Sequence, residues 1–389
     1  MTELETPLLR DTAAAESGDV KTEEMILNMG PQHPSTHGVL RVVVRTDGEI
    51  VLDCEPHLGF LHRCFEKIAE SVNYTQVTPY TDRMDYLMSM GNNLGYCVAV
   101  EKLVGEPVPD RAWHIRTIVV ELDRIASHLI AIGTYGLDAG ALTPFFYALR
   151  DREKILRIFE EICGQRLNYN YVRIGGVAYD LPEGVESRIL EFCDYFEPKV
   201  DEWDRLLTYN GIFIKRVANV GVLPVPLAID WGVTGPCLRG SGVKRDLRKK
   251  PGYGIYDKFD FDVPVGRGEM GTVGDCWDRY IVRVREIRES LKIIRQAVKS
   301  LPAGDHLAAW AKRRIRPPKG DAYTKIENAR GELGFYIVSD GTDKPFRVKT
   351  RGPSFCNIAI LPEISRGCMI ADLIVIIGSI DIVVGETDR

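Results

Sequence analysis

The chain has 389 residues, of which 45% are hydrophobic, and a formal net charge of -5 at pH 7. This length allows two or three domains, and the hydrophobic fraction is enough to bury a large core. The negative charge and the lack of a long basic stretch argue against nucleic acid as the main partner. Nine cysteines are scattered without a C-x-x-C pair, so their spacing predicts no zinc or iron–sulfur site and indicates a reducing compartment.

Residues 1–24 are acidic and rich in small side chains, and we expect a disordered or partner-binding arm there. The stretch GPQHPSTHGVLR, residues 30–41, follows. Its prolines and glycines exclude a regular helix, and the segments on both sides are apolar and strand-like. We predict a turn between two strands that presents His33 and His37. Both a structural turn with hydrogen-bonded histidines and a functional site fit this pattern.

Helical periodicity dominates the middle of the chain. Asp82 is predicted to cap the second helix and Gly105 to end it. The last helix alternates apolar residues with Arg and Glu, and we expect its charged face to be solvated or to form a subunit surface. Before it lies a loop rich in Gly and Arg that we expect to be functional or to bind a subunit. The predicted helices cover residues 61–72, 83–104, 110–132, 143–164, 182–210 and 275–300, and the loop covers 234–274.

The C-terminal part is predicted to contain strands at 334–339 and 346–349 around the turn Asp340-Gly341. The most apolar run, 369–385, is interrupted by Asp372 and Asp381 and falls short of the roughly 20 apolar residues of a membrane span. We expect a buried helix followed by an apolar tail there, and a soluble or peripheral chain.

These elements predict an α+β fold in which a central antiparallel helix bundle lies between N-terminal and C-terminal β elements. We expect four regions: an arm at 1–24, an N-terminal α+β region at 25–80, the helical bundle at 81–300, and a C-terminal β region with the buried helix and tail at 301–389.

Several long motifs occur in a characteristic order. They are GPQHPSTHGVLR (30–41), PHLGFLHR (56–63), YTDRMDYL (80–87), RIASHL (124–129), GALTPFFYALRDRE (140–153), NYVRIGGV (170–177), NARGELG (328–334) and IDIVVGETDR (380–389). In these motifs the chain resembles the D subunit of NADH:quinone oxidoreductase, respiratory complex I. That family is in turn similar to the large subunit of nickel–iron hydrogenases, so the resemblance implies a hydrogenase large-subunit-like fold.

The comparison with hydrogenases implies that a metal site has been lost. Hydrogenases hold nickel with four cysteines in two C-x-x-C pairs, because soft thiolates suit nickel and iron. The corresponding positions are Asp85, Met88, Val383 and Glu386, and no thiol stands at any of them. We therefore expect no metal in this chain, and a cavity with polar lining that holds the headgroup of a quinone.

The resemblance also assigns residue roles. Tyr86 and His37 are expected to donate hydrogen bonds to the two quinone carbonyls, and Asp138 to pair with His37. Arg83 is expected to lie near a four-iron four-sulfur cluster held by the neighbouring B subunit. Taken alone, Tyr86 could be a core tyrosine, Asp138 a cap and Arg83 half of a salt bridge.

Quinone is thus the expected substrate, and its reduction is coupled in the family to proton translocation by the membrane arm. The expected partners are the B, C and I subunits and the membrane-embedded H subunit of the quinone channel. The expected location is peripheral, on the cytoplasmic face of the bacterial inner membrane. Three alternatives stay open: a ferredoxin-driven complex, an energy-converting hydrogenase subunit, and a structural adaptor without chemistry.

The chain departs from the family at three places. Cys64 replaces a usual glycine, and its packing and redox reactivity are open. Asn168 stands where many members carry a histidine near the cluster, so proton uptake linked to reduction is in doubt there. Residues 302–318 look shortened, and their partner contacts are expected to differ.

Overall fold

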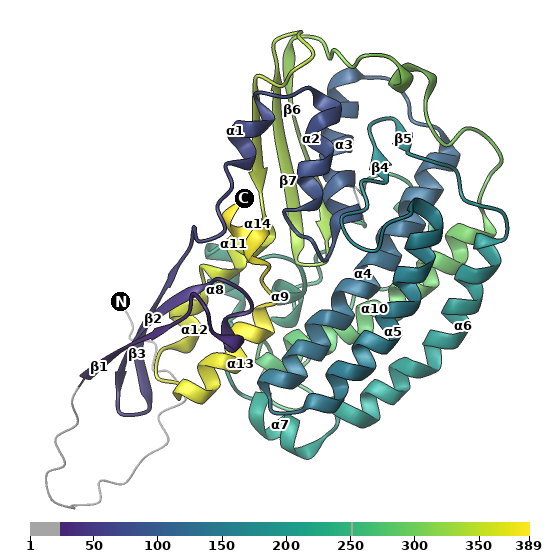
Figure 1. Ribbon diagram of the computed structural model, residues 1–389. Coiled ribbons are helices and arrows are strands. Elements are labelled where there is room, and N and C mark those ends of the chain that lie inside the picture. Colours follow the sequence, from purple (N-terminus) through teal and green to yellow (C-terminus); the bar gives the residue numbers. More distant parts are fainter. Residues whose placement is uncertain (1–23, 250–251) are drawn as a thin grey trace, which may run out of the picture.

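The structure, a computed structural model, describes residues 24–249 and 252–389 (Figure 1). The arm expected at 1–24 therefore lies outside the described residues except for Glu24, which begins the first strand. The described chain has the predicted α+β fold, in which long helices pack side by side and antiparallel sheets lie toward both ends of the sequence.

The first sheet is antiparallel, with β1 (Glu24–Met29), β2 (Arg41–Asp47) and β3 (Ile50–His57) in that order. It projects from the body of the molecule beside the C-terminal helices (Figure 1). The predicted turn between β1 and β2 is confirmed. It nevertheless contains one short 3-10 helix, η1 (Pro34–Thr36), because a proline at the first position of a helix loses no hydrogen bond. A short helix, α1 (Phe65–Ala69), follows within the predicted range.

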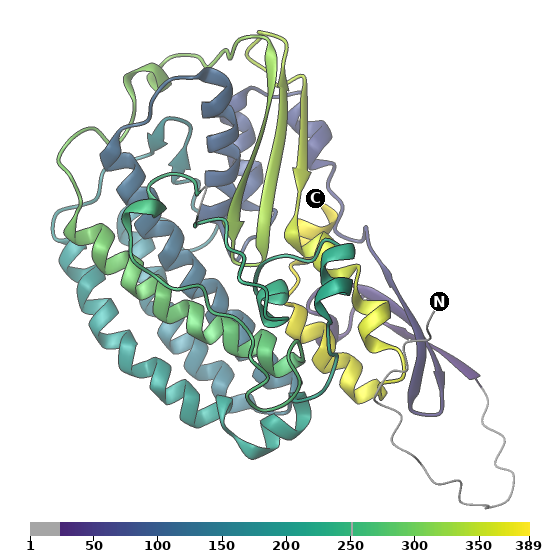
Figure 2. The same cartoon turned by 180° about the vertical axis from the view of Figure 1, so that it is seen from behind.

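Four long helices form the bundle, and Figures 1 and 2 show them from opposite sides. Helix α4 packs against α5 and α10, and α6 packs against the same two helices. The helix predicted at 275–300 is confirmed, and Asp275 caps α10, since its side chain accepts a hydrogen bond from the third backbone N–H of the helix. The four helices are α4 (Asp110–Asp138), α5 (Leu142–Cys163), α6 (Val185–Trp203) and α10 (Cys276–Lys299).

The single helix predicted at 83–104 is wrong at its start. The chain forms α2 (Tyr74–Asp82), an irregular linker at 83–88, and α3 (Ser89–Val104). Asp82 is the last residue of α2 and not a cap, although Gly105 ends α3 in the left-handed conformation as predicted. The linker leaves the helical path where Asp85 binds Arg330, a distant residue that local periodicity cannot reveal.

Several short elements were not predicted. Among its described residues, the loop at 234–274 contains one short helix and one 3-10 turn. The segment at 302–318 contains another 3-10 turn. A π-helical turn continues α6 within the predicted range. The short elements are β4 (Val172–Arg173), β5 (Gly176–Val177), the π-helix η2 (Asp204–Thr208), α7 (Gly211–Val217), α8 (Val225–Asp230), α9 (Gly235–Gly240), η3 (Tyr256–Lys258) and η4 (Ala309–Lys312).

The second three-stranded sheet is antiparallel, in the order β6-β7-β8, and packs on α3. Its turn at Asp340-Gly341 was predicted, but β6 was not. Its elements and the following helices are β6 (Gly320–Asn328), β7 (Gly331–Ser339), β8 (Arg347–Arg351), α11 (Pro353–Ile358), α12 (Leu361–Ser365), α13 (Ile370–Ile380) and α14 (Val384–Asp388). Helix α13 is the predicted buried helix. Among residues 24–249 and 252–389, no helix is both long and apolar enough to span a membrane.

The expectation that the charged face of α10 is solvated is wrong for part of that face, although Lys292 is exposed. The other expectation, a subunit surface, stays a prediction. Glu286 of α10 is fully buried, and its carboxylate binds His128 Nε2 at 2.9 Å and Arg239 Nε at 2.7 Å. Arg239 also binds Glu327 of β6 at 2.7 Å. Buried charges are tolerated when they are paired, and these pairs join α4, α9, α10 and β6. The sequence shows the charges but not their partners.

A second buried cluster surrounds Glu121 of α4. Its carboxylate lies 3.2 Å from Arg124 Nε and 3.1 Å from Arg248 Nη1, and it accepts hydrogen bonds from Ser290 and Tyr256. Burial alone would raise the pKa of Glu121, but the two guanidinium groups and the two hydroxyls lower it to about 2. Glu121 is therefore ionised at neutral pH.

We predict that Glu121→Gln lowers the free energy of unfolding by about 3–5 kcal/mol, because it leaves two buried guanidinium groups without their shared counter-charge. Chemical denaturation of the purified chain measures this. Glu191→Gln, on the exposed face of α6, is the matched control and should change stability by less than about 0.5 kcal/mol. Equal effects of the two substitutions would show that the Glu121 cluster does not stabilise the fold.

Candidate functional site

His37 and Asp138 form a short ion pair at the end of the N-terminal turn. His37 Nε2 lies 2.7 Å from Asp138 Oδ2, and both side chains are largely buried. His37 directly follows η1 in the left-handed conformation, and Asp138 is the last residue of α4. Gly378 of α13 packs against the Asp138 carboxylate, where a Cβ atom would collide with Oδ2. Three separate segments therefore fix this pair.

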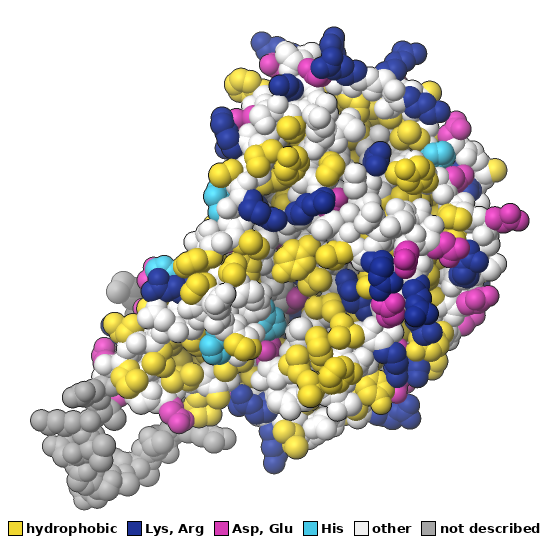
Figure 3. Space-filling model, in the orientation of Figure 1, with side chains coloured by type: hydrophobic (Ala, Val, Ile, Leu, Met, Phe, Trp, Pro, Cys, Tyr) yellow, Lys and Arg dark blue, Asp and Glu magenta, His cyan; other side chains and the backbone are white. Residues whose placement is uncertain are grey.

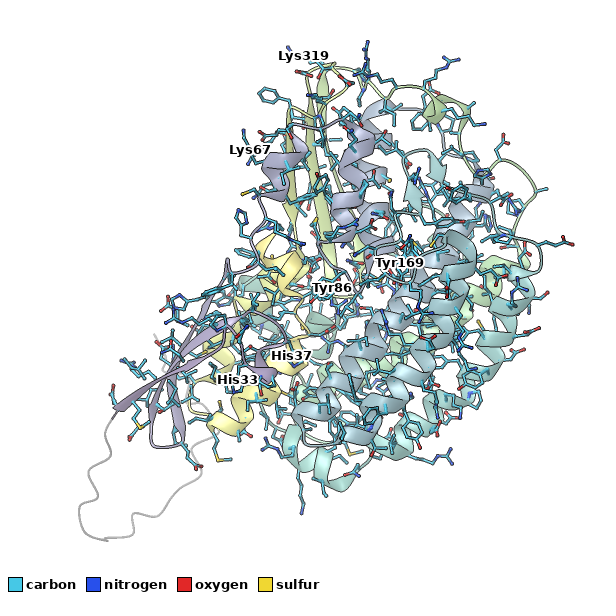
Figure 4. The ribbon with its side chains drawn as sticks, viewed as in Figure 1. His33, His37, Lys67, Tyr86, Tyr169 and Lys319 are labelled. Carbon is cyan, nitrogen blue, oxygen red and sulfur yellow. The ribbon has the colours of Figure 1, made fainter. Side chains whose placement is uncertain are left out.

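The pair lies in the wall of a cavity of about 470 Å³. Tyr86 contributes to the same cavity from the linker between α2 and α3, and Figure 4 shows His37 and Tyr86 near each other where the N-terminal turn meets the helices. On this face, histidine and acidic side chains lie among hydrophobic ones (Figure 3). The cavity is lined by Pro34, Ser35, His37, Tyr86, Leu87, Ile130, Thr134, Leu137, Asp138, Ile374, Asp381, Ile382 and Val383. The structure thus brings together three of the four predicted site residues.

The surroundings favour the protonated form of both candidate donors. Burial alone would lower the pKa of His37. The hydrogen bond and charge of Asp138, together with the charge of Asp381, raise the pKa by more than burial lowers it, so it lies above its usual value. Burial and the charge of Asp85 raise the pKa of Tyr86. A charged imidazole and a neutral phenol can both donate a hydrogen bond into the cavity.

Asp381 is a site residue that the sequence did not identify. It follows α13 in the left-handed conformation and lies 3.2 Å from Arg330 and 3.6 Å from Arg283. Its Oδ1 atom faces Arg330, while its buried Oδ2 atom has no hydrogen-bond partner among the described residues. The only signal in the sequence was that Asp381 interrupts an apolar run.

The two histidines of the turn have different surroundings. His33 precedes η1, and its Nδ1 atom accepts a hydrogen bond from the backbone of Ser35 at 3.2 Å. His33 is exposed and does not line the cavity. The structural interpretation therefore fits His33, and the functional interpretation stays open only for His37.

Arg83 lies at a different pocket, of about 480 Å³, which Asn168, Asn170 and Arg173 also line. Arg83 is 48% exposed and donates to the carbonyl oxygen of Pro79 at 2.7 Å. The buried Oδ1 atom of Asn168 has no partner among the described residues. The two guanidinium groups, of Arg83 and Arg173, suit a negatively charged neighbour. The structure thus places Arg83 beside Asn168 but outside the His37 cavity.

The four positions that correspond to hydrogenase thiolates form no metal site. The charge of Asp85 raises the pKa of Glu386, so these two positions, far apart in the sequence, lie near each other in the fold. Within the described residues, no group of three or more His, Cys, Asp or Glu side chains is arranged to hold a metal ion. All nine cysteines are free. Cys64 is exposed and precedes α1 in the left-handed conformation, which suits the glycine expected from the family resemblance. Its sulfur atom lies 3.6 Å from His62 Nε2.

Residues 138–315 and 306–389 match the family described as the 49 kDa subunit of respiratory-chain NADH dehydrogenase. The NADH-quinone oxidoreductase D subunit of Chlorobium luteolum is 54% identical over 374 residues, which cover 95% of each chain. The D subunit numbered 1 of Cytophaga hutchinsonii is 53% identical over 382 residues, covering 96% of this chain and 97% of the relative. The D subunit numbered 2 of Anaeromyxobacter dehalogenans is 52% identical over 371 residues, covering 95% and 98%.

The fold and these matches define the chain as a subunit of a respiratory-chain dehydrogenase. The chain belongs to the family of NADH-quinone oxidoreductase D subunits, which confirms the resemblance carried by its motifs. It is one subunit of that oxidoreductase complex, complex I, and other subunits of the complex are its partners.

We predict that Asp138→Asn lowers the pKa of His37, because it removes the nearest negative charge. Only the neutral imidazole reacts with diethyl pyrocarbonate, so His37 should react at lower pH in the variant than in the native chain. Peptide mass spectrometry across a pH series of the assembled complex measures this, with exposed His33 as the internal reference. The same pH profile for His37 in both proteins would show that Asp138 does not control its charge.

Proposed function

We propose that the His37–Tyr86 cavity binds a quinone headgroup and is where the complex reduces it. The observation that supports this most is the convergence of two protonated donors on one cavity, one from the turn after β1 and one from the linker before α3. Its other walls are largely apolar, including Leu87, Leu137 and Ile382. A few placed donors in an apolar cavity are what a planar ring with two carbonyl oxygens needs.

In this proposal Tyr86 and His37 each donate to one carbonyl oxygen. Reduction of a quinone to a quinol adds two electrons and two protons, one proton at each oxygen. The donors stabilise the charge that develops on those oxygens and give up their protons. Asp138 orients the imidazole of His37 and favours its charged form through the 2.7 Å contact. Asp138 thus acts through His37: it accepts the hydrogen bond from Nε2, which leaves the N–H at Nδ1 to donate to the carbonyl oxygen.

The electrons are proposed to come from a four-iron four-sulfur cluster held by the neighbouring B subunit. The pocket of Arg83 and Asn168 fits a negatively charged group of a partner, since Arg83 is half exposed and Arg173 adds a second positive charge. Arg83 would stabilise the reduced, more negative form of such a group.

The remaining partners and the location are part of the same proposal. We assign contacts to the C and I subunits and to the membrane-embedded H subunit, and a peripheral position on the cytoplasmic face of the bacterial inner membrane. Quinone reduction would be coupled there to proton translocation by the membrane arm. The absence of thiols at Asp85, Met88, Val383 and Glu386 counts against a hydrogenase-related subunit. The convergence of His37, Tyr86 and Asp138 counts against an adaptor without chemistry.

We predict that Tyr86→Phe slows quinone reduction on the order of a hundredfold, because losing a donor to a developing charge costs about 3 kcal/mol. The ring is kept, so folding and assembly should survive. Two assays on the assembled complex measure this. Reduction of an artificial acceptor by NADH (or by ferredoxin in a ferredoxin-driven complex) tests the upstream chain, and reduction of a short-chain quinone tests the cavity.

Tyr336→Phe, on the exposed side of β7, is the matched control and should leave both activities at the native rate. Intact quinone reduction in Tyr86→Phe would remove Tyr86 from the site. So would an equal loss of both activities in a complex that still assembles.

A separate prediction concerns Arg83. Arg83→Met should lower the midpoint potential of the neighbouring subunit's cluster, because a nearby positive charge is removed. Redox titration of the assembled complex followed by EPR measures this. Arg157→Met, on a mostly exposed side chain of α5, is the control and should leave the potential unchanged. An unshifted potential in Arg83→Met would mean that the Arg83 pocket does not face the cluster.

A further inference from the structure

Glu386 is a fully buried carboxyl group that the proposed reaction does not yet use. Its Oε2 atom accepts hydrogen bonds from the backbone N–H of Ser354 at 3.0 Å and from the Ser354 hydroxyl. Its Oε1 atom is buried and has no hydrogen-bond partner among the described residues. Glu386 also forms no ion pair within the part of the chain that the structure describes. An ionised carboxylate is costly in such a place, whereas a proton on Oε1 removes the charge.

The neighbouring charges also favour a proton on Glu386. Asp85 and Asp381 share Arg330, whose Nη1 and Nη2 atoms lie 3.1 Å and 3.2 Å from their carboxylates. Arg283 adds a second cation, 3.6 Å from Asp381. Asp85 and Asp381 therefore each have a guanidinium partner, whereas Glu386 has none among the described residues. Asp123 is a further buried carboxyl group beside Asp85, and burial raises the pKa of Asp123 well above its usual value. The lack of an ion pair favours a proton on Glu386.

Burial and the charge of Asp85 raise the pKa of Glu386 to about 7, against the lowering effects of Ser354 and Arg330. At neutral pH the group therefore lies near the midpoint of its titration. It can release a proton and recover it without a large change in free energy.

The cluster adjoins the cavity. Its member Asp381 lines the cavity itself, and Asp85 directly precedes the lining residue Tyr86. Gly385, next to Glu386, packs against the backbone oxygen of Met84, next to Asp85. The charge of Asp85 acts on both Tyr86 and Glu386. If Tyr86 gives its proton to a bound quinone, a phenolate is left beside the Asp85 carboxyl group. The charge of Asp85 disfavours that phenolate and so favours the return of a proton to Tyr86.

We propose that Glu386 is the acid that returns a proton to Tyr86 after each reduction. The inference rests on the proposed quinone site. The proton leaves Glu386 Oε1 and the phenolate oxygen of Tyr86 gains it. The Glu386 carboxylate then takes a proton that originates in solvent, and no electrons move in this step. Glu386 touches no substrate, so its role is to restore the donor.

The test compares the first turnover with steady turnover in the assembled complex. In Glu386→Gln, Tyr86 begins with its own proton, so the first quinone should be reduced at the native rate. Later turnovers should slow by at least about tenfold, because the internal acid is missing. Tyr86→Phe should slow the first turnover as well. Glu191→Gln, on the exposed face of α6, is the control and should behave as the native complex.

Infrared spectroscopy of the same complexes gives a readout that does not depend on activity. The native complex should show a buried carboxylic acid band that titrates near pH 7, and Glu386→Gln should lack it. Ser354→Ala removes a donor that favours the ionised form, so it should move the titration to higher pH. If Glu386→Gln does not assemble, Ser354→Ala tests the inference in its place.

Native steady turnover in Glu386→Gln, or an infrared band that neither substitution changes, would overturn the inference. A first turnover slowed as much as in Tyr86→Phe would also overturn it, because that result means a structural role. These outcomes differ from failure of the quinone site itself, in which Tyr86→Phe would keep native quinone reduction.

Discussion

Arg330 is the residue on which the geometry of the cavity depends most. Its guanidinium group binds Asp85, in the linker before α3, and Asp381, at the end of α13. Tyr86, which follows Asp85, and Ile382, which follows Asp381, both line the cavity, so one buried cation connects two segments of the lining. Arg330 itself lies between β6 and β7, which makes the second sheet the anchor of the site. A buried guanidinium must be paired, and this requirement selects one arrangement of three distant segments.

Pairing of buried charges also holds the helix bundle together. Glu286 and Arg239 connect α10, α9 and β6, and His128 connects them to α4. These contacts fix the position of α4 along its axis, and the last residue of α4 is Asp138. The ion pairs in the core and the His37–Asp138 pair are therefore connected through the same helix, α4. A chemistry that moves protons needs donors held at defined distances, and a core built on directional, paired charges supplies such rigidity.

Sequence reasoning succeeded where structure is local and failed where it depends on distant partners. Helical periodicity predicted α4, α5 and α10, because this signal lies within each helix. The break at 83–88 was missed, since Arg330 lies far away in sequence. The exposure of some α10 charges was predicted wrongly for the same reason. In the site, motif resemblance led to His37, Tyr86 and Asp138, and these do share one cavity. Asp381 and Glu386 were not predicted as site residues. Both stand in the motif IDIVVGETDR, but that motif alone does not show which buried partners they meet.

The central claim is that the quinone headgroup lies between His37 and Tyr86. The most direct measurement is photolabelling of the assembled complex with a quinone that carries a photoreactive group on its ring, followed by peptide mass spectrometry. The account predicts labels on the cavity lining, at Tyr86 and at apolar neighbours such as Leu137 and Ile382, which an excess of unlabelled quinone removes. Labels that unlabelled quinone removes but that fall on another surface of the chain, with none in this cavity, would contradict it.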